Sequence, residues 1–454
     1  MPRGLIAAAL ASLLLLGCKD VHETTLPNGL KVIVKEDHRS PVVVSQIWYK
    51  VGGSYEPDGL TGVSHVLEHM MFKGTKRYGP GAFSRIIAEN GGRDNAFTGA
   101  DYTAYFQRLE KSRLAIAFKL EADRMKNLLL DEEEFRKEVK VVMEERRLRT
   151  DDRPEGRLHE TFMATAYKVH PYKQPIIGTW DDLKKMTVDD ARAWYERWYT
   201  PNNATLVIVG DVKRREVLAL AQQYFGPIEP IPITRNDPPV EPVQTAARRV
   251  RVEAPAKVPY VTLGYHVPAY GEYDVPWEPY ALAVLVGILD GGRSARFPSE
   301  LIRNRRIATK LDTGYSPASR SATLLVFDGI PGNGHTIAEL ERAIRDQIER
   351  LKKELVSQDE LDRVKAQVVA GDIYSLDSVF YQAMRIGILE TTGAEWDRMQ
   401  EYVDRIRAVT AEQVQGVARR YLVDANLTVA VLDPLPIEPG KKRPRAGVGG
   451  RHGN

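Results

Sequence analysis

Cysteine is almost absent from this chain, because Cys18 is the only one among 454 residues. One cysteine cannot form an internal disulfide, so the fold must depend on a large apolar core. Hydrophobic residues make up 43% of the sequence, which is ordinary for soluble globular proteins. No cysteine follows Cys18, which excludes a thiolate metal site and a cysteine nucleophile.

Long apolar segments are also lacking, apart from one run near the start. Residues 5–16 follow Arg3 and are too few to span a bilayer comfortably, which is typical of a secretory signal. The run ends in Leu15-Leu16-Gly17-Cys18, which resembles a bacterial lipobox. Residues 1–18 are therefore predicted to be a signal peptide, with Cys18 lipidated. The alternative is an ordinary signal peptide with an incidental cysteine.

This segment also predicts a location. We expect an exported lipoprotein that faces the periplasm of a bacterium and is held to a membrane by its lipid alone. Lys19, which follows the lipobox cysteine, favours the outer membrane.

A strong excess of charge of one sign is missing as well. Lys and Arg number 64 and Asp and Glu number 61, so the formal net charge is only +3. This balance gives no reason to expect nucleic acid as a partner. Part of the positive charge lies in residues 435–454, where Pro, Gly and basic residues dominate, and we expect a disordered tail there.

The remaining residues divide into two parts joined by a proline-rich stretch. Proline removes backbone donors and blocks helices, so residues 229–247 are interpreted as a linker. The linker separates predicted domains at 24–228 and 248–434, and residues 19–25 are predicted to be a tether. Periodicity predicts strands at 30–35, 42–49, 103–107, 206–209, 258–266, 309–328 and 427–432, and helices at 61–73, 80–90, 112–127, 131–149, 187–198, 277–289, 336–354, 357–371, 376–390 and 410–421.

The two parts repeat each other at an offset of 223 residues. At this offset the end of the first part aligns with the end of the second, and both read as helix, short turn and strand. Strands followed by runs of helices favour the α+β class over a doubly wound parallel sheet. The sequence therefore predicts two similar α+β domains, each an antiparallel-rich sheet packed with helices, related by internal duplication. The identical pairs are Thr187 and Thr410, Arg197 and Arg420, Asn203 and Asn426, and Thr205 and Thr428.

A metal-binding pattern lies in the helix predicted over 61–73. His65 and His69 are four residues apart and share one helix face, so two neutral imidazoles can bind one zinc ion. Glu68 is three residues from His65 and is suited to act as general base on a metal-bound water. The order His-x-x-Glu-His inverts the His-Glu-x-x-His order and is the inverzincin motif. A structural pair of histidines is the plain alternative.

A catalytic zinc site needs a third protein ligand as well as an open position. The charged helix predicted over 131–149 offers several carboxylates, and a solvated helix face is the ordinary explanation for most of them. Composition alone does not choose between them. The candidates are Glu132, Glu133, Glu134, Glu138, Glu144 and Glu145.

The segments Gly62–Thr75 and Glu138–Arg146 resemble the pitrilysin and mitochondrial-processing-peptidase family of zinc metallopeptidases. In that family the third ligand is a Glu about 76 residues after the second His, with a supporting Glu seven residues before it. The resemblance thus implies Glu145 as ligand and Glu138 as the residue that orients the site, with Glu144 as the rival ligand. It implies one zinc per chain and an endopeptidase in which zinc activates water and Glu68 is the general base.

The resemblance also implies a substrate site. Residues 91–106 match an edge strand that pairs with the peptide substrate in the family, and such an edge binds peptide through main-chain hydrogen bonds. The expected substrate contacts are Asn95, Ala96, Phe97 and Thr98. An ordinary hairpin bounded by glycines is the alternative.

The second half of the chain has no His-x-x-Glu-His. Family members often carry an Arg and a Tyr about seven residues apart there, which hold the substrate from the far wall. In this sequence Arg303 fits the Arg, but Thr309 stands where the Tyr is expected and the spacing is one residue short. We therefore expect a dimer, with the hypothesis of a heterodimer whose metal-free homologous subunit provides the Arg/Tyr pair. The alternatives to a peptidase are a non-catalytic structural subunit of the core type and a zinc-binding peptide receptor.

Overall fold

Runs of Val and Ile build the central strands of the first sheet in the computed structural model, which describes residues 21–235, 237–273 and 275–437. The sheet order is β1-β2-β6-β3-β5-β4. β2 and β6 run parallel, and all the remaining neighbouring strands in this sheet are antiparallel. The strands are β1 (Val21–Thr25), β2 (Lys31–Glu36), β3 (Val42–Tyr49), β4 (Arg93–Thr98), β5 (Thr103–Glu110) and β6 (Ala204–Gly210).

The second sheet repeats this arrangement with one strand fewer. Its order is β7-β11-β8-β10-β9. β7 and β11 are parallel, and the other pairs are antiparallel. β7, β11, β8, β10 and β9 therefore correspond to β2, β6, β3, β5 and β4. The strands are β7 (Arg248–Pro255), β8 (Tyr260–Val267), β9 (Ala308–Gly314), β10 (Thr323–Pro331) and β11 (Leu427–Leu435).

The predicted repeat is visible residue by residue at the end of each domain. The helices α7 (Val188–Trp198) and α14 (Ala411–Tyr421) have the same length and differ by the offset of 223. Thr187 and Thr410 each cap their helix in a capping box. The Asn203 amide donates to the Trp198 carbonyl at 2.9 Å, and the equivalent Asn426 amide donates to the Tyr421 carbonyl at 3.0 Å. Two similar α+β domains are thus confirmed.

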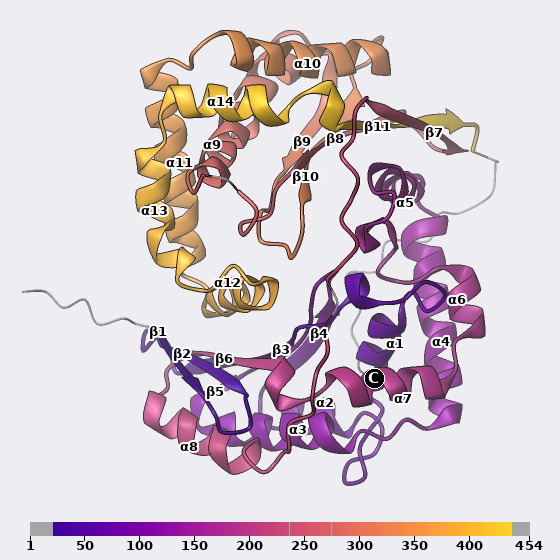
Figure 1. The fold of residues 1–454 in the computed structure, drawn as a ribbon, viewed down its shortest axis with the longest axis vertical. Coiled ribbons are helices and arrows are strands. Elements are labelled where there is room, and N and C mark those ends of the chain that lie inside the picture. Colours follow the sequence, from indigo (N-terminus) through magenta and orange to yellow (C-terminus); the bar gives the residue numbers. More distant parts are fainter. Residues whose placement is uncertain (1–20, 236, 274, 438–454) are drawn as a thin grey trace, which may run out of the picture.

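Helices cover one face of each sheet with their own domain's apolar residues (Figure 1). In the first domain, Val32, Val34, Ile47 and Tyr105 of the sheet belong to one buried cluster with these helices. The helices of the first domain are α1 (Val63–Met70), α2 (Ala82–Glu89), α3 (Leu114–Asn127), α4 (Glu132–Arg146), α5 (Pro154–Ala166), α6 (Trp180–Lys185), α7 and α8 (Arg214–Tyr224). Those of the second are α9 (Glu278–Asp290), α10 (Ile337–Lys353), α11 (Gln358–Ser375), α12 (Val379–Thr392), α13 (Arg398–Ala408) and α14.

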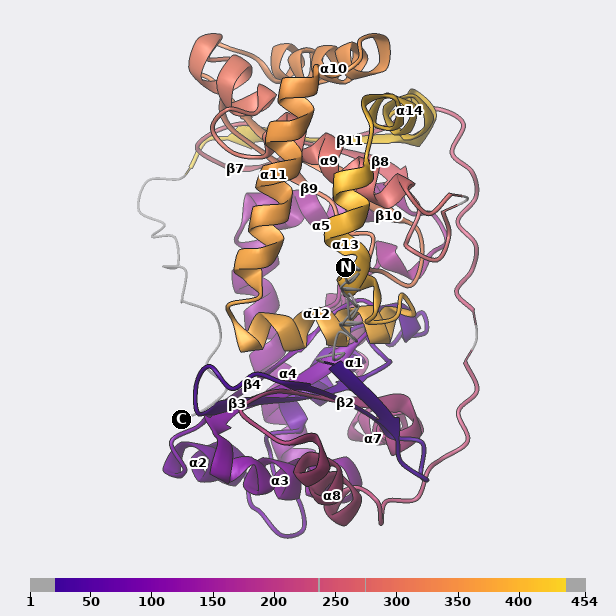
Figure 2. The same cartoon turned by 90° about the vertical axis from the view of Figure 1, so that its left-hand side faces the viewer.

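The two domains exchange one helix each. α5 of the first domain packs on β7 and β11 of the second sheet, and α12 of the second domain packs on β3 and β6 of the first (Figures 1 and 2). Phe162 of α5 lies in one buried cluster with Ala430 and Leu432. Trp48 of β3 lies in another with Ile386 of α12. Each sheet therefore buries its second face against the other domain, which fixes how the domains sit together.

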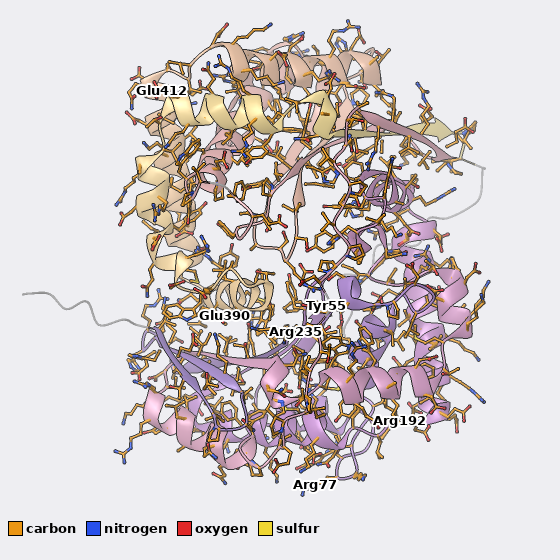
Figure 3. The ribbon with its side chains drawn as sticks, viewed as in Figure 1. Tyr55, Arg77, Arg192, Arg235, Glu390 and Glu412 are labelled. Atoms are coloured by element: carbon orange, nitrogen blue, oxygen red, sulfur yellow. The ribbon has the colours of Figure 1, made fainter. Side chains whose placement is uncertain are left out.

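Glycine makes both exchanged contacts possible. A Cβ atom on Gly387 of α12 would lie 1.9 Å from Cε2 of Trp48, and one on Gly264 of β8 would lie 2.4 Å from Cζ of Phe162. Polar contacts add to this interface: Lys31 Nζ of β2 lies 2.7 Å from Glu390 Oε2 of α12, a residue labelled in Figure 3. Neither aromatic ring could approach the opposing backbone so closely if the glycine carried a side chain.

The connection between the domains runs along one side of the molecule (Figure 2). Its described residues between 225 and 247 form neither helix nor strand. The predicted tether over 19–25 is wrong for its last five residues, because Val21–Thr25 pairs with β2 as an edge strand. The folded part therefore starts before the predicted boundary at residue 24, and Leu435 still belongs to β11.

The predicted signal peptide with Cys18 and most of the predicted tail lie outside the described residues. Among the residues that are described, no helix combines the length and the apolar character that crossing a bilayer requires.

Candidate metal centre

The helix that carries His65 and His69 starts at a tightly held turn. Gly62 precedes α1 with a φ of 88°, which favours glycine. The Glu56 carboxylate accepts hydrogen bonds from the backbone N–H groups of Gly62 at 2.6 Å and Ser64 at 2.8 Å. The Thr61 N–H donates to Asp182 at 3.1 Å. Carboxylates thus satisfy N–H groups that a helix start leaves without partners, and they fix the helix in place.

His65, His69 and Glu145 come together between α1 and α4. The Nε2 atoms of His65 and His69 lie 3.8 and 3.5 Å from Glu145 Oε2. One ligand atom from each of the three residues falls within 4.8 Å of the others, and no second group of this kind exists among the described residues. Two imidazole nitrogens and one carboxylate oxygen form the donor set of a catalytic zinc site.

The electrostatics of this group favour a cation. Burial lowers the pKa of His69, but hydrogen bonds with Glu138 and Glu145 outweigh it and raise the pKa to about 9. Burial raises the pKa of Glu145, yet the hydrogen bond with His69 and the charges of His65 and Arg149 bring it down to about 2. Carboxylates that hold a proton on a buried imidazole stabilise a divalent cation at the same place. The residues therefore fit a zinc ion.

Glu138 holds the second histidine in position. Its Oε2 atom lies 3.1 Å from Nδ1 of His69, and its Oε1 atom lies 2.6 Å from Nζ of Lys73. With Nδ1–H of His69 donating to Glu138, Nε2 is the atom that faces Glu145. Such a carboxylate fixes both the tautomer and the orientation of a ligand imidazole.

Glu68 lies in the same cavity but outside the ligand group. The Thr98 hydroxyl donates to Glu68 Oε2 at 2.5 Å, which ties the α1 carboxylate to β4. Burial raises the pKa of Glu68 to about 7, despite the opposing hydrogen bond from Thr98. A carboxylate with a pKa near neutrality can take up and release a proton at physiological pH.

An open strand edge borders the metal group. A cavity of about 520 Å³ is lined by His65, Glu68 and Glu145 on one side and by residues 95–98 of β4 on the other. Among the described residues, β4 pairs with β5 alone and forms the edge of the sheet. The Ala96 N–H is satisfied by the side chain of Asn95 at 2.9 Å, so it does not bond to β5. The four residues expected to contact substrate are thus brought to the metal group.

Other predicted residues lie elsewhere. Glu144 is exposed and forms an ion pair with Arg147, so the structure places Glu145 rather than Glu144 beside the histidines. Arg303 is exposed and donates to the Arg293 carbonyl. Thr309 donates to the Pro331 carbonyl at 3.2 Å. Neither Arg303 nor Thr309 lines the metal cavity.

The sequence reasoning missed three charged residues around this site. Arg149 lies 2.6 Å from the second oxygen of Glu145 and lines the cavity. Lys73 contacts Glu138, and Glu56 holds the start of α1. Arg149 stands four residues after Glu145, an ion-pair spacing on a helix that could have revealed it. Lys73 and Glu56 act across elements and leave no such local signal.

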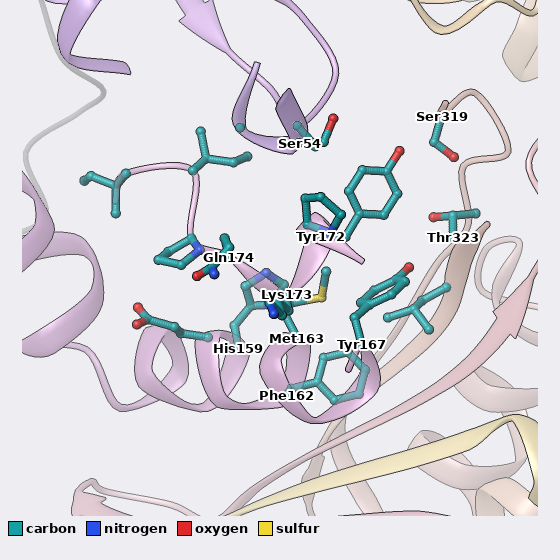
Figure 4. Close-up of a pocket in the computed structure, with 18 of the residues that line it drawn as sticks. Ser54, His159, Phe162, Met163, Tyr167, Tyr172, Lys173, Gln174, Ser319 and Thr323 are labelled. Carbon is teal, nitrogen blue, oxygen red and sulfur yellow. The ribbon is translucent and has the colours of Figure 1, made fainter. Parts of the chain in front are cut away.

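A larger cavity of about 680 Å³ adjoins the metal cavity, where α5 meets β10 (Figure 4). It shares Arg149, Thr150, Ile176 and Ile177 with the metal cavity. Its walls are largely apolar and aromatic, as the labelled Phe162, Met163, Tyr167 and Tyr172 illustrate. The metal group thus opens toward the interface between the domains, a common place for ligand binding.

Two family models match the chain one after the other. The model described as "Insulinase (Peptidase family M16)" matches residues 31–180, which include the metal group. The model described as "Peptidase M16 inactive domain" matches residues 185–368. The boundary between the two matches falls before α7.

Relatives cover nearly the whole chain. The zinc protease PqqE of Helicobacter pylori is 34% identical over 421 residues, which are 91% of this chain and 93% of that protein. An uncharacterized zinc protease of Streptomyces coelicolor is 27% identical over 427 residues, 92% of this chain and 91% of that protein. The crystal structure of a protease from Helicobacter pylori has a TM-score of 0.86 at 31% identity and covers 91% of this chain and 99% of its own.

A more distant structure shows likeness of fold alone. The peptidase M16 inactive domain from Pseudomonas fluorescens has a TM-score of 0.81 at 18% identity, covering 92% of this chain and 100% of its own.

Proposed function

Because the chain belongs to the M16 (insulinase/pitrilysin) family of zinc proteases, in its two-domain bacterial type, we propose that it is an endopeptidase acting on unfolded peptides or short polypeptides. The observation that carries the proposal is the group of His65, His69 and Glu145 beside Glu68, in a cavity bordered by the open edge of β4. Such an edge binds extended main chain, which an unfolded peptide offers along its whole length.

His65, His69 and Glu145 would hold the zinc ion, and Glu138 would orient His69. Bound zinc would polarise the scissile carbonyl and make a water molecule acidic. Glu68 is placed to accept the proton of the attacking water and to pass it to the leaving nitrogen. Burial raises the pKa of Glu68 to about 7, which supports its role as proton acceptor. The hydroxyl of Thr98 fixes the carboxylate in the position from which it acts.

The open edge of β4 would bind the peptide main chain. The Asn95 side chain now occupies the Ala96 N–H, as a peptide carbonyl would in an added strand. We infer that an arriving peptide displaces the Asn95 side chain from the Ala96 N–H and adds a strand to the sheet. Main-chain hydrogen bonds of this kind are largely independent of the peptide's sequence.

We further propose a dimer, in which a metal-free homologous subunit supplies an Arg/Tyr pair from the far wall. The support is that Thr309 stands at the expected Tyr position and bonds to Pro331 within its own domain. The purified chain alone should then cleave peptide poorly, and a homologous subunit should restore activity. Full activity of a pure homodimer contradicts the heterodimer.

The proposed location is the periplasmic side of a bacterial membrane, through a lipid on Cys18. Its support is the lipobox-like run that ends at this residue. Cys18→Ser should move the protein from the membrane fraction to the soluble fraction, with loss of the lipid mass. Unchanged partitioning contradicts the lipid anchor.

A cleavage assay tests the enzymatic proposal. A quenched unfolded peptide should be cleaved slowly by the native chain alone and faster with its homologous subunit, and a chelator should abolish the cleavage in both cases. Glu68→Gln should bind zinc and peptide without cleaving, whereas Glu144→Gln, a matched change at an exposed carboxylate, should remain active. Zinc and peptide binding without cleavage by the native chain indicates a receptor instead. Absence of zinc binding, peptide binding and cleavage indicates a structural subunit.

A further inference from the structure

Two arginines stand side by side at the start of the open strand β4. Arg93 on β4 and Arg108 on β5 are direct cross-strand partners. Side chains of directly opposed residues point to the same face of a sheet. The Arg108 guanidinium lies 3.9 Å from the centre of the Phe380 ring, so this is the face that α12 covers. Figure 2 shows α12 lying over the sheet that contains β3 and β4.

The positive charge of this pair is unbalanced. Across the described ranges, neither Arg93 nor Arg108 forms an ion pair or a side-chain hydrogen bond. Burial lowers the pKa of Arg108, and the charge of Arg93 lowers it further. Like charges that face each other across two strands destabilise the pairing, so a negative group beside them would be favourable.

The acidic groups nearby are already engaged. Arg39 lies 2.6 Å from Asp37 and 3.1 Å from Asp377. The Glu110 carboxylate accepts a hydrogen bond from the Ser112 N–H at 3.0 Å. These acids therefore leave the charge of the arginine pair available to a ligand.

Space for a ligand exists at this place. A cavity of about 610 Å³ is lined by Arg93, Arg108 and Phe380, together with residues of β3 and the loop before α12. It lies along the same strand whose other end borders the metal group. Arg93, Asn95 and Phe97 alternate along β4 and share one face, so the strand joins the two places.

A peptide added to β4 would place its own side chains in register with these residues. Neighbouring strands lie about 4.8 Å apart, and residues opposite each other share a face. The peptide residue opposite Phe97 meets an aromatic surface. The ring centres of Phe97 and Phe106 are 6.3 Å apart, and those of Phe106 and Phe380 are 4.8 Å apart. The peptide residue opposite Arg93 meets both arginines instead.

We propose that Arg93 and Arg108 select an acidic side chain of the peptide substrate, at the position that pairs with Arg93. The inference rests on the proposed peptidase function and on peptide binding along β4. In antiparallel pairing the peptide passes Thr98 first and Arg93 last. The selected Asp or Glu therefore lies on the C-terminal side of the residues that face the metal group.

Peptides that differ by one charge test the inference. One quenched peptide sequence carries Glu, Gln or Lys at successive positions, and mass spectrometry locates the cleaved bond. At one position the Glu peptide should be cleaved with a kcat/KM about 5-fold above the Gln peptide, mainly through KM, because the contact is remote from the reacting atoms. The preference should weaken at high salt.

Variants then assign the preference to these residues. Arg93→Gln and Arg108→Gln should bring the Glu/Gln ratio toward one, and Arg93→Glu should reverse it in favour of Lys. Arg136→Gln removes the same charge from an exposed arginine that pairs with Glu132 on α4, and it should keep the native ratio. A ratio unaffected by changes at Arg93 and Arg108, or lost equally in Arg136→Gln, overturns the inference.

Binding separates this inference from the proposed function. The Glu68→Gln chain should bind the fluorescent Glu peptide more tightly than the Gln peptide in fluorescence anisotropy. Absence of any cleavage by the native chain contradicts the peptidase proposal. Cleavage and binding that both ignore the charge of the peptide contradict only the acidic preference.

Discussion

The two domains share one topology, yet among the described residues only the first brings metal-binding side chains together. α1 in the first domain and α9 in the second each pack in the apolar cluster formed by their own domain's sheet and helices. α1 carries His65, Glu68 and His69, whereas α9 buries Val284, Leu285 and Ile288 among its own domain's helices. The comparison shows that the fold supplies positions for side chains, and that the chemistry depends on a few of them.

The second domain also supports the first structurally. Its helix α12 packs on the second face of the first sheet, and α5 of the first domain packs on the second face of the second sheet. The sheet that carries β4 is thereby packed on both faces while one edge remains free. The duplicated half thus acts as a rigid support for a site that it does not itself contain.

The largest expected effect is the loss of metal binding and cleavage when a histidine of the first domain is replaced, but not when one of the second domain is replaced. His65→Ala or His69→Ala should abolish both metal binding and peptide cleavage, because each removes one of three ligands. His335→Ala, in the second domain, should leave both unchanged. Metal content by mass spectrometry and cleavage rate measure the effect. Equal losses in His335→Ala would contradict the assignment of the metal site to the first domain.

Support of the metal ligand should give the next largest effect. Glu138→Gln should weaken zinc binding by about 10- to 100-fold, because the hydrogen bond from His69 loses its charged acceptor. Competition with a chelator of known affinity measures this change. Glu133→Gln, at an exposed position of the same helix, serves as control, and a similar loss there contradicts the role of Glu138.

The exchanged helices predict matched losses of stability in both halves. Gly387→Ala and Gly264→Ala should each lower the free energy of unfolding by about 1–3 kcal/mol, since the added methyl group overlaps Trp48 or Phe162. Gly371→Ala in α11 has nothing within 4 Å and should instead stabilise by about 0.5–1 kcal/mol. Denaturant unfolding measures the free energy of unfolding of the three variants. A loss of stability in only one of Gly387→Ala and Gly264→Ala would contradict the equivalence of the two exchanged contacts.

The smallest effect concerns the repeated helix caps. Thr187→Ala and Thr410→Ala should each cost about 1 kcal/mol of stability, because each removes the hydroxyl of a capping box. Thr161→Ala, whose hydroxyl bonds to the backbone of its own helix, should have little effect. Thermal unfolding measures all three, and clearly unequal effects of the two caps weaken the structural equivalence.

Local patterns in the sequence predicted much of the fold. The helix α7 and the strand β3 carry strong periodicity, and both lie where the sequence predicts them. Periodicity does not predict β7, although Arg and Val alternate along it, and β1 is wrongly predicted to be a tether because it is a short edge strand. The sequence does not predict the helix α5, and it gives no sign of the exchange of α5 and α12, since periodicity shows which face of a helix is apolar but not what covers it.

The site divides in the same way. His65, Glu68 and His69 stand within one helix, so their spacing indicated metal chemistry. Glu145 lies 76 residues beyond His69, and only the family resemblance selected it from its acidic neighbours. Arg93 and Arg108 are paired by the register of β4 and β5, which the sequence does not reveal.

One zinc ion should bind between α1 and α4, and the second domain should bind none. Anomalous diffraction at the zinc edge from crystals of the purified chain tests it most directly. One peak per chain is expected, about 2.0–2.2 Å from the ligand atoms of His65, His69 and Glu145. A peak elsewhere, or none beside these residues in zinc-loaded crystals, would contradict it.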